Sequence, residues 1–189
     1  MPAIELRPGF FMFAIVLAAL DRSGSVLPIL CAMAVHELAH VVMMLACGGQ
    51  VRRLTLRFAD LQIAASGLGY RQELLSALAG PLVNLICGAA FCMQRPSFAA
   101  YSLMLGIYNL LPVWPLDGGR MIRCALLARL PITQAEHISE IVSFAACAVL
   151  LLIGVFLTFF RKSGLWPLGT AAYLTVRLLM LARRTDAVQ

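Results

Sequence analysis

The feature that most restricts the fold of this chain is a series of long stretches without charged residues. An α-helix crosses the hydrocarbon core of a bilayer with about 20 apolar residues. The 189-residue sequence predicts six such helices, at about residues 8–20, 25–47, 74–94, 97–116, 141–160 and 165–182. We therefore expect an all-α polytopic, integral membrane protein with one membrane-embedded domain, residues 1–189.

The composition supports a lipid environment. Hydrophobic residues make up 61% of the chain and charged residues 13%, whereas about a quarter of a soluble domain is charged. The net charge is +6, but the arginines occur singly or in pairs at the ends of apolar stretches and form no basic stripe. This distribution is typical of membrane anchoring. We expect the lipid bilayer as a partner, and no nucleic acid.

The same charges predict an orientation, because cytoplasmic loops of membrane proteins carry an excess of Lys and Arg. With six helices, more of these residues fall on the side that holds both termini than on the other side. We therefore expect a protein of a bacterial cytoplasmic membrane with both termini in the cytoplasm.

A β-hairpin is predicted at about residues 51–66, at the membrane surface between the second and third helices. Here Leu54 and Leu56 alternate with Arg53, Thr55 and Arg57, which is the two-residue period of a strand. An edge strand of this kind can pair with an extended peptide. Leu54, Thr55 and Leu56 are therefore candidates for pairing with an extended segment of a bound protein.

The sequence HELAH at residues 36–40 is an H-E-x-x-H motif. On a helix, His36 and His40 lie on one face one turn apart, so both imidazoles can reach a single metal ion. Glu37 can then take a proton from a water whose pKa the metal lowers. The alternative is that the histidines only bond to neighbouring helices and Glu37 is protonated. Ionisable residues inside a membrane are expensive, however, and are functional by default.

A third ligand is predicted at Asp117, in the sequence NLLPVWPLDGGR at residues 109–120. Catalytic zinc usually has three protein ligands and an open fourth position. Two prolines interrupt helical structure here, and two glycines allow the backbone to come close to another group. The alternative is a helix-ending turn in which Asp117 only pairs with Arg120.

Together HELAH, NLLPVWPLDGGR and the intervening AGPLVN at residues 79–84 resemble the site-2 protease family of intramembrane zinc metalloproteases, peptidase family M50. The resemblance is strongest to the bacterial sporulation-type branch, which processes a membrane-tethered pro-sigma factor. It implies one catalytic Zn²⁺ bound by His36, His40 and Asp117, with Glu37 as general base.

The resemblance also implies that Gly80, Pro81 and Asn84 lie near the site, where Asn84 is a candidate for polarising the carbonyl or binding substrate. From the residues alone, Asn84 could equally be an interhelical hydrogen-bonding group, and Asn109 has the same two interpretations. Sporulation-type members commonly carry a CBS domain after the membrane core, which we expect to be absent here. Regulation of that kind would then be absent or come from another protein, such as a regulatory membrane partner.

The sequence therefore predicts a protease that hydrolyses a peptide bond of a membrane-anchored substrate protein near the cytoplasmic face, in regulated intramembrane proteolysis. The alternatives are a non-proteolytic zinc-binding membrane protein and a metal or proton transporter. A transporter should show paired polar groups along a path, whereas His36, Glu37, His40 and Asp117 are expected at one depth.

Overall fold

The computed structural model describes residues 3–6, 19, 21, 24–57, 60–161 and 164–186. The helix expected at residues 8–20 lies outside this set except for Ala19. The chain divides into two compact units, Met1–Asn109 and Leu110–Gln189. Each unit is described by itself.

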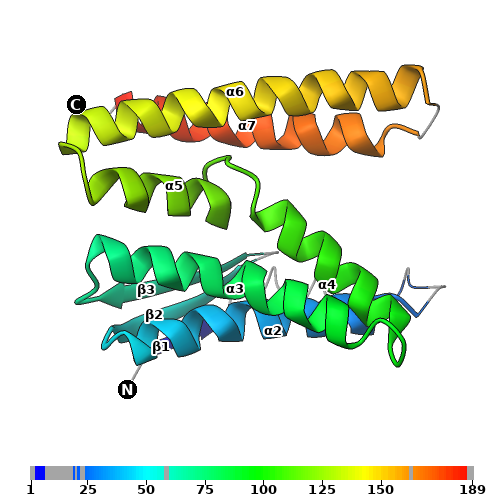
Figure 1. Ribbon diagram of the computed structural model, residues 1–189, viewed down its shortest axis with the longest axis horizontal. Coiled ribbons are helices and arrows are strands. Elements are labelled where there is room, and N and C mark those ends of the chain that lie inside the picture. Colours follow the sequence, from blue (N-terminus) through cyan, green and yellow to red (C-terminus); the bar gives the residue numbers. More distant parts are fainter. Residues whose placement is uncertain are drawn as a thin grey trace. The chain divides into compact units, whose positions relative to one another are not determined.

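Three helices of the first unit pack against one another (Figure 1): α2 (Val26–Ala46), α3 (Tyr70–Ala90) and α4 (Pro96–Asn109). Small residues bring α3 and α4 close together. A Cβ added to Gly106 of α4 would lie 3.0 Å from the carbonyl oxygen of Pro81, and a Cβ added to Gly88 of α3 would lie 3.2 Å from that of Ala99. Side chains at these glycines would force the two helices apart.

The first unit also contains a three-stranded sheet in the order β1-β2-β3: β1 (Ala3–Leu6), β2 (Gln50–Arg57) and β3 (Asp60–Ser66). Strands β2 and β3 are antiparallel, in the region where the sequence predicts a hairpin, and Thr55 lies opposite Gln62. Residues 58 and 59, within the expected turn, lie outside the described residues. Strand β1 pairs with β2 in parallel, with Glu5 opposite Thr55.

This strand order corrects the expected site of substrate pairing. Leu54, Thr55 and Leu56 belong to the middle strand, and both of its edges are occupied, by β1 on one side and β3 on the other. A further strand cannot add to these residues while both neighbours are in place. Within the described residues, the open edges of the sheet belong to β1 and β3.

The second unit contains the helices α5 (Asp117–Leu127), α6 (Ile132–Phe159) and α7 (Trp166–Asp186). The long helices α6 and α7 lie side by side (Figure 1), and α5 packs against α6. A Cβ added to Gly154 of α6 would lie 3.0 Å from the carbonyl oxygen of Pro167, so the two helices are in close contact at that level.

The all-α membrane class predicted from the sequence is confirmed. Among the described residues, three of the helices are long and apolar enough to cross a bilayer: α2, α3 and α6. Their outer surfaces expose large apolar side chains, such as Leu38 (61% exposed) on α2 and Leu152 (71%) on α6. Outside a bilayer these side chains would be in contact with water.

One predicted helix ends earlier than expected. The stretch 97–116 is apolar throughout, but α4 stops at Asn109 because Pro112 and Pro115 have no backbone N–H for the helical hydrogen-bond ladder. A turn follows, with a cis peptide bond between Trp114 and Pro115. The chain becomes helical again at Asp117, at the start of a helix that the sequence analysis did not predict.

Candidate metal centre

The two histidines of the HELAH motif lie on the buried face of α2, and 4% of His36 and 3% of His40 is exposed. Their Nε2 atoms are 3.1 Å apart. Two imidazole nitrogens bound to one tetrahedral zinc at about 2.05 Å would be about 3.3 Å apart. The pair is therefore already close to the spacing that a single ion requires.

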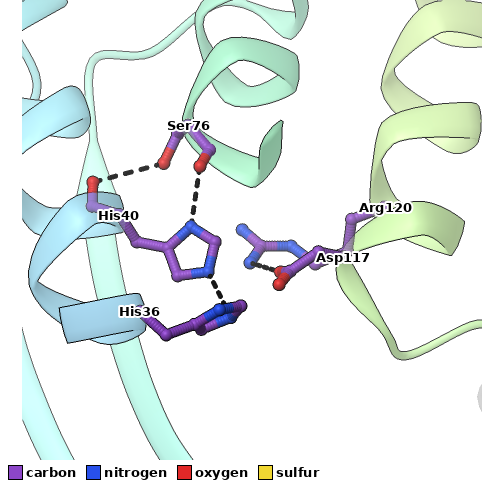
Figure 2. Close-up of polar contacts among 5 residues, drawn as sticks. All are labelled: His36, His40, Ser76, Asp117 and Arg120. Carbon is purple, nitrogen blue, oxygen red and sulfur yellow. Dashed lines mark hydrogen bonds and ion pairs between the residues drawn. The ribbon is translucent and has the colours of Figure 1, made fainter. Parts of the chain in front are cut away.

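Helix α3 fixes the orientation of His40. The Nδ1 atom of His40 is 2.7 Å from the backbone carbonyl oxygen of Ser76, to which an Nδ1–H group donates. The hydroxyl of Ser76 donates in return to the carbonyl oxygen of His40, at 3.4 Å. Figure 2 shows these contacts. A proton at Nδ1 leaves the lone pair of Nε2 for a metal, which is the usual role of such a second contact.

His36 has a corresponding partner in Asn84, which is also on α3 and completely buried. The side-chain nitrogen of Asn84 lies 3.2 Å from Nδ1 of His36. Asn84, named by the sequence analysis as a candidate for binding substrate or polarising a carbonyl, thus contacts the outward nitrogen of a candidate metal ligand.

Gly80 provides the space in which the imidazoles pack. A Cβ at this position would lie 2.9 Å from Cε1 of His36 and closer still to the ring of His40. Such contacts are shorter than van der Waals distances, so any larger residue would push the rings away. Pro81 follows within α3 and is also buried. The AGPLVN segment therefore lies directly against the histidines.

Asp117 is the first residue of α5 and is 7% exposed. A carboxylate is favourable at this end of a helix, where unpaired N–H groups carry partial positive charge. Nη1 of Arg120 lies 3.5 Å from Oδ1 of Asp117, as Figure 2 shows. The pairing with Arg120 considered in the sequence analysis is therefore present, but it is long and Arg120 is 35% exposed at its side chain.

The turn before Asp117 is held by contacts within the second unit. The N–H group of Trp114 donates to the hydroxyl of Ser143 on α6 at 3.1 Å, and that hydroxyl donates to the carbonyl oxygen of Ser139 at 2.9 Å. The guanidinium of Arg123 lies over the Trp114 ring at 5.7 Å and forms a 2.8 Å ion pair with Glu136.

The two glycines after Asp117 lie directly against this turn. A Cβ on Gly119 would be 2.5 Å from the backbone nitrogen of Trp114, and one on Gly118 would overlap the carbonyl groups of Leu110 and Leu111. The close approach predicted from the glycine pair is therefore an approach to the turn's own backbone.

His36 and His40 supply two buried imidazole nitrogens in the first unit, and Asp117 supplies a buried carboxylate in the second unit. Two imidazole nitrogens and one carboxylate oxygen are a donor set that catalytic zinc sites use, and three protein ligands leave a fourth position open. The residues present thus fit the metal that the motifs predict.

The remaining candidates lie near the ends or faces of their helices. Glu37 is half-buried on α2, next to the first histidine. Asn109 is the last residue of α4 and its amide donates to the carbonyl oxygen of Leu105 at 3.1 Å.

The sequence analysis missed Ser76 and Ser143. Ser76 orients His40 through its backbone carbonyl, a group that every residue has, so its type carries no signal.

Comparisons with known proteins find similarity to metalloproteases. Residues 95–153 match the family described as Peptidase family M50. A zinc metalloprotease of Methanocaldococcus jannaschii is 27% identical over 172 residues, which cover 80% of this chain and 51% of that protein. Stage IV sporulation protein FB of Bacillus subtilis is 25% identical over 169 residues, which cover 82% of this chain and 58% of that protein. The chain thus spans between half and three fifths of these relatives.

A solved structure shows the same fold. The site-2 protease from Methanocaldococcus jannaschii matches with a TM-score of 0.65 at 20% identity, over 94% of this chain and 89% of that one. The resemblance predicted from the motifs is confirmed. The fold is that of a site-2 protease, and the sporulation protein among the relatives agrees with the branch named from the sequence.

Proposed function

We propose that the chain is a site-2 type zinc metalloprotease, and that it hydrolyses a peptide bond of a membrane-anchored substrate protein. The observation that carries the proposal is the buried pair of His36 and His40, whose Nε2 atoms are 3.1 Å apart, on a chain whose H-E-x-x-H motif lies in an apolar helix. The M50 match and the zinc metalloprotease among the relatives support the same reaction.

In this proposal His36, His40 and Asp117 hold the ion, and Glu37 is the catalytic residue. When bound, zinc supplies Lewis-acid polarisation of the scissile carbonyl and acidifies a water molecule. The carboxylate of Glu37 takes the proton from the attacking water and delivers it to the leaving amine, as general base and then general acid. Its neighbour in sequence, His36, is a ligand, so the carboxylate starts close to the reacting atoms.

Substrate binding involves two further groups of residues in the proposal. Gly80 and Pro81 keep the backbone of α3 close to the imidazoles. The amide of Asn109 is the polar group available for the substrate carbonyl, since Asn84, the other candidate, contacts His36. An extended substrate segment adds to the sheet, where β3 offers an open edge among the described residues. Strand addition at β3 replaces the pairing at Leu54, Thr55 and Leu56 predicted from the sequence.

The location of the reaction is also part of the proposal. The distribution of Lys and Arg favours both termini in the cytoplasm, in the cytoplasmic membrane of a bacterium, and cleavage near the cytoplasmic face. The substrate is a regulator tethered to the same membrane, and a separate membrane protein regulates the cleavage. The resemblance of the motifs to the sporulation-type branch supports a role of this kind.

The proposal is tested with the Glu37→Gln substitution. The full chain and Glu37→Gln are co-expressed with a panel of membrane-tethered proteins, and the purified proteins are assayed for zinc. Loss of a general base lowers the cleavage rate about 10²- to 10⁴-fold, while the zinc content stays that of the wild type. The matched control is Glu140→Gln, which removes an exposed carboxylate on α6 and leaves cleavage unchanged.

Each alternative function gives a different result. A non-proteolytic zinc-binding protein would show the same phenotype for the wild type and Glu37→Gln. A transporter would carry zinc or protons into sealed vesicles and cleave none of the panel. Either result would contradict the proposed protease.

A further inference from the structure

Two completely buried polar groups of the first unit have no hydrogen-bond partner among the described residues: Oδ1 of Asn84 on α3 and Oγ of Ser102 on α4. Leaving a buried acceptor or hydroxyl unsatisfied costs stability. The amide of Asn84 at the same time places its nitrogen 3.2 Å from Nδ1 of His36.

The contacts between α3 and α4 bring these two side chains to the same level. Gly106 of α4 lies against Pro81, and Gly88 of α3 lies against Leu103 and Ala99, so the helices are antiparallel. Asn84 is three residues after Pro81 and four before Gly88. Ser102 is likewise three residues after Ala99 and four before Gly106. Each therefore lies midway between the two points of close approach.

Both side chains also turn toward the same side of the helix pair. In an antiparallel pair, residues at the same offset from facing positions lie on the same flank. Asn84 reaches His36 of α2 from this flank, and α2 packs against both α3 and α4. Asn84 and Ser102 thus converge in the interior of the three-helix layer, behind His36.

The chemistry of the histidine decides how the amide has to lie. When Nε2 of His36 binds a metal, the neutral imidazole carries its proton on Nδ1. The Nδ1–H group then needs an acceptor, and an amide nitrogen is a donor only. Turning the Asn84 amide by half a rotation presents Oδ1 to Nδ1–H and directs the amide nitrogen away from His36, toward the flank where Ser102 has its unpartnered oxygen.

We propose that Asn84 is a positioning residue for His36, and that Ser102 supports it. Oδ1 of Asn84 accepts the Nδ1–H bond of metal-bound His36, and the amide nitrogen of Asn84 donates to Oγ of Ser102. The rotation of the amide satisfies Oδ1 of Asn84, and a change of the Ser102 rotamer then brings Oγ to the amide nitrogen. Metal ligands depend on such partners for ring orientation, and loss of a partner typically lowers metal affinity 10- to 100-fold. The inference rests on the proposed function, since it assumes that His36 is a ligand.

The test measures zinc affinity of the purified full chain by competition with a chelator, and the absorption spectrum of the cobalt form. Asn84→Leu keeps the branched shape of the side chain but removes the acceptor, and lowers affinity about 10- to 100-fold. Asn84→Asp retains an acceptor and stays within about threefold of the wild type. Ser102→Ala lowers affinity by less than about tenfold, below the range for loss of a ligand's direct partner, because the amide loses its support. The control Ser139→Ala changes a buried hydroxyl on α6 and has no effect.

Three results would overturn the inference. Wild-type zinc affinity in Asn84→Leu with lost cleavage would make Asn84 a substrate-binding residue. A zinc affinity of Asn84→Asp as low as that of Asn84→Leu would exclude an acceptor role. The stabilities of these two variants are compared by unfolding the metal-free proteins. Ser102→Ala equal to the wild type would remove Ser102 from the arrangement.

The same measurements test the proposed function independently of this inference. A wild-type protein whose zinc affinity depends on Asn84 as described, but which cleaves none of the tethered proteins, would refute the protease and leave the positioning role intact. Cleavage that depends on Glu37 together with zinc affinity that is independent of Asn84 would do the reverse.

Discussion

The two histidines and the aspartate that are proposed to bind zinc are held in place in different ways. His36 and His40 lie in the interior of one helix, where the helical repeat itself fixes their spacing, and α3 supplies their contacts through Ser76, Gly80 and Asn84. Asp117 begins a helix directly after a proline-containing turn, and its position depends on what holds that turn.

This difference has a consequence for substitutions. The spacing of the histidines is set by local backbone hydrogen bonds, so only a direct collision with the rings disturbs it strongly. The turn before Asp117 has few hydrogen bonds of its own and relies on Ser143 and on close backbone approach at Gly118 and Gly119. Substitutions at Ser143, Gly118 or Gly119 should therefore displace the Asp117 carboxylate by different amounts.

The largest effect is expected for Gly80→Ala. The new methyl group would overlap both imidazoles, and α3 and α2 cannot separate without losing their packing. We expect zinc affinity to fall on the order of 100-fold, as for loss of an important partner of a ligand, measured by chelator competition.

A matched control for this substitution is Gly169→Ala on α7, where an added Cβ meets nothing within 4 Å. Alanine is favoured over glycine in a helix by about 1 kcal/mol, so this variant should bind zinc normally and be slightly more stable. Equal zinc affinity in Gly80→Ala and Gly169→Ala would show that the histidines do not need the space.

A smaller loss is expected for Gly118→Ala. Its methyl group would overlap the carbonyl groups of Leu110 and Leu111, and the turn has to open to accept it. Displacement of Asp117 should lower zinc affinity about tenfold while the cobalt spectrum keeps the contribution of two imidazole ligands. Unchanged affinity and spectrum would mean that the carboxylate does not follow the turn.

The smallest effect is expected for Ser143→Ala. The N–H group of Trp114 loses its acceptor, which lowers the free energy of unfolding by about 1 kcal/mol. Chemical denaturation in detergent should detect this change, with zinc affinity reduced by less than in Gly118→Ala. A loss of zinc binding larger than that of Gly80→Ala would mean that zinc binding depends more on the support of Asp117 than on that of the histidines.

The sequence predicted the parts of the site that follow from local periodicity. A separation of four residues on an apolar helix suffices to bring His36 and His40 together, and the same spacing makes them a motif. Asp117 was found because an acid in an otherwise apolar stretch is conspicuous, and because prolines and glycines around it indicate an irregular backbone.

The sequence could not give the structure around these residues. Hydropathy does not distinguish a membrane helix from a buried turn, so the predicted helix at residues 97–116 ran past Asn109 and α5 was missed. The four-residue strand β1 is too short for a periodic signal, and its pairing with β2 changed which edge of the sheet is open. The contacts of Ser76 and Asn84 cross between helices, and that of Ser143 joins α6 to the turn at Trp114. No local pattern encodes them.

The parallel pairing of β1 with β2 also constrains how the chain can be threaded through lipid. The two strands belong to one sheet, with Glu5 opposite Thr55, and a sheet has to remain on one side of a bilayer because its polar edge groups cannot be exposed to hydrocarbon. Leu6 and Gln50 therefore lie on the same side of the bilayer, so the end of α2 that leads into β2 is on the side where β1 lies.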